Sequence, residues 1–67
     1  MKKEELLNLG FIDTSYADVE QFTLEINEFT QIETYRNYVD ICFFGDWINV
    51  PNCKTIYDMK NLIKLFS

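Results

Sequence analysis

The feature that most constrains how this chain folds is an alternation of apolar and polar residues in its middle section. Apolar side chains recur at every second position in residues 22–26, 39–43 and 48–50, and in a fourth stretch, residues 30–34, Ile32 lies between Thr30 and Thr34. Successive side chains of a β-strand point to opposite faces, so a period of two predicts strands with one apolar and one polar face. We therefore expect four strands, joined by short turns, in one antiparallel sheet.

The turn residues predict how these strands pair. Gly45–Asp46 suits a two-residue turn, because glycine is preferred at the first central position of a type II′ turn. This turn places Phe44 opposite Trp47, and the aliphatic residues of the two strands then share one face. A two-residue turn at residues 36–37 and a three-residue loop at residues 27–29 keep the earlier strands in the same arrangement. All three turns are consistent with one sheet.

The segment EELLNLGF near the amino terminus has the pattern of a short helix. Its leucines precede Gly10, which suits the left-handed backbone conformation that ends many helices, and Phe11 can then fold back onto Leu6. The following residues, 12–20, are polar and show no period. We expect a loop there.

The closing segment TIYDMKNLIKLF is the clearest helix. Thr55 is placed to cap it, and Asp58 follows three residues later in a variant of the capping box. Apolar residues at helical spacing form one stripe along it, namely Ile56, Met59, Leu62, Ile63 and Phe66. This stripe is expected to pack on the apolar face of the sheet.

These elements predict an α+β fold: a four-stranded antiparallel meander with a C-terminal helix packed on one face and a short N-terminal helix. A chain of 67 residues has room for one domain, residues 1–67, and for one core. A domain this small buries little surface, so oligomerisation or binding to a partner is expected to add to its stability.

Charge is unevenly distributed along the chain, whose net charge is −5. Between residues 13 and 46 there are eight acidic residues and a single cation, Arg36, while the lysines lie near the two ends. Direct binding to a nucleic-acid backbone needs a cluster of cations and is not expected. The acidic section suits a protein partner with a basic surface, although a solvated surface that favours solubility explains it as well.

No apolar run approaches the length that spans a bilayer, and two glutamates occupy the place where a signal peptide needs its apolar stretch. We therefore expect no membrane association and a cytoplasmic location.

The predicted exposed face of the sheet combines aromatic and acidic side chains. Glu33 falls directly opposite Asp40, and like charges in this position are unfavourable unless water screens them or a basic partner neutralises them. Scattered aromatic residues are common on exposed sheets, but they also anchor interfaces. Self-association through this face and binding to another protein both remain open. The predicted partner-binding residues are Phe44, Trp47, Tyr35, Tyr38, Glu33, Asp40 and Glu25.

Several kinds of chemistry lack the residues they need. The chain has no histidine and only two glycines, which argues against acid–base catalysis and against a phosphate-binding loop. Cys42 and Cys53 could form a disulfide, a metal clip or a catalytic thiol, but their predicted separation, the lack of a second cysteine pair and the lack of a nearby base disfavour each in turn. We expect two reduced thiols, no cofactor, no metal and no enzymatic activity.

The two ends, EELLNLGF and TIYDMKNLIKLF, around a short β-meander resemble small uncharacterised proteins of bacteriophages and mobile elements. That resemblance implies an inhibitor of a host defence protein, one that binds its target and acts in the host cytoplasm.

The first hypothesis is therefore a small binding protein that docks its acidic, aromatic face on a basic surface. The alternatives are an oligomer that sequesters a small ligand such as a nucleotide signal between subunits, and a structural accessory protein.

Overall fold

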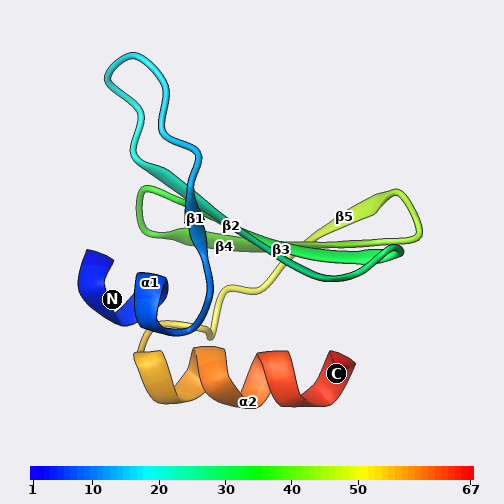
Figure 1. Ribbon diagram of the computed structural model, residues 1–67. Coiled ribbons are helices and arrows are strands. Elements are labelled where there is room, and N and C mark those ends of the chain that lie inside the picture. The colour runs from blue at the N-terminus through cyan, green and yellow to red at the C-terminus, as the bar shows by residue number, and fades with distance from the viewer.

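The computed structural model describes residues 1–67, and both of its helices lie on the same side of an antiparallel sheet (Figure 1). The sheet has five strands in the order β1-β2-β3-β4-β5, so each strand pairs with its neighbour in sequence. The predicted α+β meander is confirmed in outline. The elements are α1 (Lys3–Asn8), β1 (Ile12–Asp13), β2 (Gln21–Asn27), β3 (Thr30–Tyr35), β4 (Tyr38–Phe43), β5 (Asp46–Asn49) and α2 (Ile56–Phe66).

The strand β1 corrects the prediction of four strands. Ile12 pairs with Thr23 and Asp13 with Phe22, within the segment for which a loop was expected. A strand of two residues is too short to show an alternation, and its existence depends on the neighbouring edge of β2. The Thr14 hydroxyl lies 2.8 Å from that of Thr23 and extends this contact.

The turn between β3 and β4 matches its prediction: Tyr35 pairs with Tyr38, and Arg36 takes a positive φ of 55°. The register between β2 and β3 is also as predicted, with Leu24 opposite Ile32. The connection itself differs from the expected three-residue loop. A β-bulge lies between Glu25 and Asn27, and a two-residue turn at residues 28–29 follows it.

The turn between β4 and β5 lies one residue earlier than predicted. Its central residues are Phe44 and Gly45, with φ values of 51° and 85°, which are the signs of a type I′ turn. Phe43 therefore pairs with Asp46, and Trp47 pairs with Cys42 rather than with Phe44. The pairing shifts by two residues, so each strand residue still points to its predicted face.

Both helices end or begin as their sequences predict. Gly10, with a φ of 101°, follows α1, and its N–H donates to the Leu7 carbonyl while the Phe11 N–H donates to the Leu6 carbonyl. This double hydrogen bond is the Schellman motif, and it folds Phe11 back into the core beside Leu6. Neither α1 nor α2 has the length and apolar character that a membrane-spanning helix needs.

At the start of α2, the Thr55 hydroxyl accepts a hydrogen bond from the Asp58 N–H at 3.2 Å, and the Asp58 carboxylate accepts one from the Thr55 N–H at 3.0 Å. The predicted capping box is thus complete.

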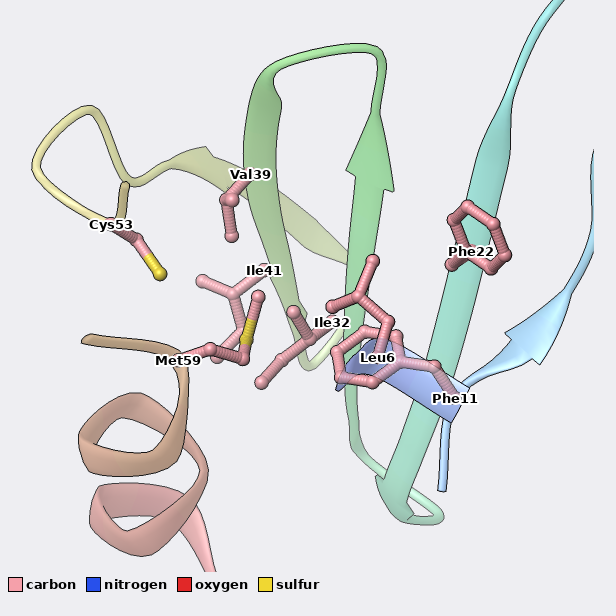
Figure 2. Close-up of a cluster of buried hydrophobic side chains, with 8 residues drawn as sticks. All are labelled: Leu6, Phe11, Phe22, Ile32, Val39, Ile41, Cys53 and Met59. Atoms are coloured by element: carbon pink, nitrogen blue, oxygen red, sulfur yellow. The ribbon is translucent and has the colours of Figure 1, made fainter. Parts of the chain in front are cut away.

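The core lies between the sheet and the helices (Figure 2). Its eight buried side chains are Leu6, Phe11, Phe22, Ile32, Val39, Ile41, Cys53 and Met59. Ile32 of β3 and Met59 of α2 are both fully buried, so the predicted packing of α2 on the sheet is confirmed. The helices do not cover the last strand, β5. Its Ile48 points to the same side of the sheet as the helices but is 53% exposed.

Candidate functional site

The sheet face that points away from α1 and α2 has no other element over it (Figure 1). We call this surface the outer face. The strand registers assign to it Gln21, Thr23, Glu25, Gln31, Glu33, Tyr35, Tyr38, Asp40, Cys42, Trp47 and Asn49. Six of the seven predicted partner-binding residues are in this set.

Cross-strand pairing arranges the outer face in three rows. One row contains Tyr35 and Tyr38, and the row at the other end contains Glu25, Gln31, Cys42 and Trp47. The central row runs Thr23, Glu33, Asp40 and Asn49. Aromatic side chains therefore flank a central pair of carboxylates on both sides.

The central pair is Glu33 and Asp40, directly opposite each other on β3 and β4 as predicted. The Asn49 side-chain amide donates to the Asp40 carboxylate at 3.0 Å and to the Val39 carbonyl at 3.3 Å. Neither carboxylate of the pair forms an ion pair, because the one ion pair in the structure joins Lys3 to Asp13. The centre of the outer face thus carries negative charge that no cation of this chain neutralises.

The aromatic residues beside this pair are accessible. Tyr38 is 63% exposed and Trp47 is 53% exposed, while Tyr35 is half-buried. The guanidinium of Arg36 lies 5.7 Å from the centre of the Tyr35 ring, close enough for a cation–π contact. Large exposed aromatic surfaces of this kind are typical of binding sites.

Phe44 is the predicted residue that the structure removes from the outer face. Its place in the turn directs it toward the neighbouring turn, where its ring stacks on Phe29 with centres 4.8 Å apart and planes at 15°. The Phe44 N–H also donates to the Phe29 carbonyl at 2.9 Å. The prediction that Phe44 lies opposite Trp47 is therefore wrong. Phe44 is a central residue of the type I′ turn between β4 and β5, and its ring stacks on Phe29.

A hollow of about 360 Å³ lies at this end of the sheet, beside the two turns. It continues the outer face, since Glu25, Gln31 and Cys42 belong to both. Its other residues are Asn27, Glu28, Phe29, Thr30, Phe44 and Gly45. The hollow therefore combines two acidic side chains with two aromatic rings.

Phe29 and Glu28 were missed by the sequence interpretation, which treated them only as loop residues. One signal could have found Phe29. In a meander, alternate turns lie at the same end of the sheet, so a phenylalanine in each of two alternate turns suggests that the rings meet.

The two cysteines occupy different environments and are not bonded to each other. Cys42 is half-buried on the outer face, whereas Cys53 is buried in the core. Burial raises the pKa of the Cys53 thiol, and the nearby charge of Asp58 raises it further. No three side chains among the cysteines and carboxylates come together in a way that could hold a metal ion.

Comparisons of this chain with protein-family models, with curated proteins and with solved structures find no significant match. The functional argument therefore rests on the geometry and charge of the outer face.

Proposed function

We propose that this protein is a non-enzymatic binding protein that uses its outer face and the adjoining hollow to hold a basic surface of another protein in the cytoplasm. The observation that carries the proposal is the carboxylate pair Glu33–Asp40, which has no cation partner and lies between exposed aromatic side chains. A cationic side chain of a partner would relieve the repulsion within this pair.

An arginine or lysine of the partner suits this surface in two ways. A guanidinium can donate hydrogen bonds to the carboxylates of both Glu33 and Asp40, and such charge-assisted bonds are stronger than neutral ones. It can also lie over an aromatic ring such as Trp47. The hollow offers a second site of the same chemistry, with Glu25 beside the stacked ring of Phe29.

The charge of the outer face also bears on the choice between partners. Two copies meeting through this face would bring four central carboxylates together, so charge complementarity favours a different, basic protein over self-association. The nucleotide-sequestering alternative needs cations beside the rings of the outer face, where Arg36 over Tyr35 is the cation so placed; the other such pair, Lys60 with Tyr57, lies on α2. Carboxylates at the centre of the face would repel phosphates. An accessory structural role would use the same surface and differs only in the identity of the partner.

The narrower proposal, inhibition of a host defence protein of a bacteriophage host, is supported by the resemblance of the two chain ends to small phage proteins. It agrees with a protein that acts by occupying a surface.

The test is affinity capture from a host lysate with the tagged protein and two matched aromatic variants. Trp47→Ala removes an exposed ring from the outer face, and Tyr57→Ala removes one from α2, where Tyr57 is 72% exposed. We expect Tyr57→Ala to capture the same protein as the wild type and Trp47→Ala to lose it, with both variants keeping the wild-type circular dichroism. Equal capture by Trp47→Ala would contradict the proposal.

The contribution of the outer-face carboxylates to binding is tested separately, by changing the salt concentration and by removing their charge. Capture should fall as salt is raised, because the attraction between exposed charges is screened. The double variant Glu33→Gln, Asp40→Asn should weaken capture, whereas Glu4→Gln on α1 should not. Capture that is unaffected by salt and by the double variant would contradict the proposal of a basic partner surface.

A further inference from the structure

A second hollow, of about 330 Å³, lies on the opposite side of the sheet from the outer face. Its lining residues come from α1, from β2 and the residue before it, from the turn that joins β3 to β4 with its flanking residues, and from the segment that leads into α2. The ribbon of Figure 1 shows α1, this turn and this segment at the same end of the molecule. The volume of the hollow is in the range of small-molecule binding pockets. Of the outer-face residues, Tyr38 alone also lines this cavity.

The floor of this cavity is apolar and buried. It includes Leu6, Phe22, Val39 and Cys53, each of which is at most 6% exposed. Figure 2 shows these four side chains within the core, coming from α1, β2, β4 and the segment before α2. Because they come from four separate parts of the chain, the floor exists only in the folded protein.

The rim of the cavity, unlike its floor, is formed by charged side chains. Arg36 and Lys54 both line it, although the chain has only six lysines and arginines in all. Neither forms an ion pair with a carboxylate, and the Arg36 guanidinium lies 5.7 Å from the centre of the Tyr35 ring. Glu20 is the one acidic residue of the lining. In a protein of net charge −5, this is a local excess of positive charge above an apolar floor.

We propose that this cavity binds a small organic anion: a carboxylate with an apolar body. The body would lie on Phe22, Leu6 and Val39, and the carboxylate would lie at the rim between Arg36 and Lys54. Charge complementarity selects this class, since a cation would meet two like charges and the acidic outer face would repel the same anion. The proposal is independent of the protein-binding function.

The first experiment is a titration of the isotope-labelled protein with octanoate, followed by NMR of its backbone amides. We expect saturable shifts that are largest at Leu6, Phe22, Val39 and Cys53. Two matched probes share the apolar body: octanol, without charge, and octylammonium, with the opposite charge. Both should bind more weakly than octanoate. An absence of saturable shifts, or shifts spread over the whole chain, would overturn the proposal.

The second experiment tests the charge at the rim with two kinds of variant, one expected to weaken octanoate binding and the other expected to strengthen it. Lys54→Gln and Arg36→Gln should each weaken octanoate binding by about two- to fivefold, as expected for exposed charges, and Glu20→Gln should strengthen it. Octanol binding should change in none of them. Lys54 lies outside the sheet, so its variant tests the charge even where Arg36→Gln disturbs the β3–β4 turn. Octanoate and octanol binding that respond equally to Lys54→Gln would overturn the assignment to an anion.

Discussion

Phe44 stacks on Phe29 with ring centres 4.8 Å apart, and this contact joins the turn between β4 and β5 to the turn between β2 and β3. Phe43 meets Phe44 edge to face at 4.6 Å and lies 5.6 Å from Phe66 at the end of α2. Four phenylalanine rings thus connect the tips of the sheet to the helix. Ring packing of this kind offsets the unfavourable positive φ of Phe44.

Replacing Phe44 with asparagine should separate the effect of the turn from that of the ring. Asparagine tolerates positive φ and suits the first position of a type I′ turn, which offsets the loss of a stack worth about 0.5–1.5 kcal/mol. We expect the free energy of unfolding to change by less than about 1 kcal/mol. Urea denaturation followed by the fluorescence of Trp47 measures it.

Phe29→Ala is the matched control for that measurement, because it removes the same stack without improving the turn. It should destabilise the protein by more than Phe44→Asn does. The opposite order would show that the stack does not hold the turn.

Replacing Glu33 with glutamine should stabilise the free protein. The change removes the repulsion with Asp40, which is worth between a few tenths of a kcal/mol and about 1 kcal/mol for directly opposed like charges. The gain should be largest at low ionic strength and should shrink as salt screens the pair. Denaturation midpoints in low and high salt measure both effects, and a loss of stability at low salt would contradict the prediction.

The cap of α2 should make a measurable contribution to stability. Thr55→Ala removes the hydroxyl that accepts from the Asp58 N–H and should cost about 1 kcal/mol, the usual effect of losing such a cap. Thermal unfolding measures the loss. Thr55→Ser keeps the hydroxyl and should remain close to the wild type, so equal losses in both variants would argue against the cap.

Asp58 should also give the protein part of its sensitivity to acid. The Lys54 N–H, followed by the Thr55 N–H and hydroxyl, holds the pKa of the Asp58 carboxyl below its usual 3.8. A group with a lowered pKa in the folded state contributes stability above its unfolded pKa and loses it as the pH falls through the folded value. Asp58→Asn should therefore have a shallower loss of stability below about pH 4 than the wild type.

The two thiols should react at different rates in the folded protein. Cys53 is buried and its pKa is raised, so little reactive thiolate forms near neutral pH. We expect iodoacetamide to alkylate the half-buried Cys42 first, which mass spectrometry of the digested protein can follow. In urea the two should react at similar rates. Equally fast native labelling of Cys53 would mean that the core opens there readily.

Much of the architecture follows from local sequence. The capping residues Thr55 and Asp58 and the helix-ending Gly10 act through neighbours a few residues away, so their roles can be inferred without knowing the fold. The alternation of apolar residues likewise determined which side chains share a face. It placed Trp47 on the outer face, and together with the predicted turn at residues 36–37 it placed Glu33 opposite Asp40, as the structure has them.

The remaining features depend on contacts between distant residues. A period of two determines the face of a residue but not its partner, because sliding a strand by two residues leaves the faces unchanged. The turn at Phe44 was therefore settled by sheet twist and by stacking on Phe29, fifteen residues away in the chain. The strand β1, the hollow beside Glu25 and the cavity beneath Arg36 also form only when the chain is folded. The sequence by itself determined the elements and their faces, and the tertiary structure decided how the turns and surfaces meet, because those contacts join residues that no local pattern relates.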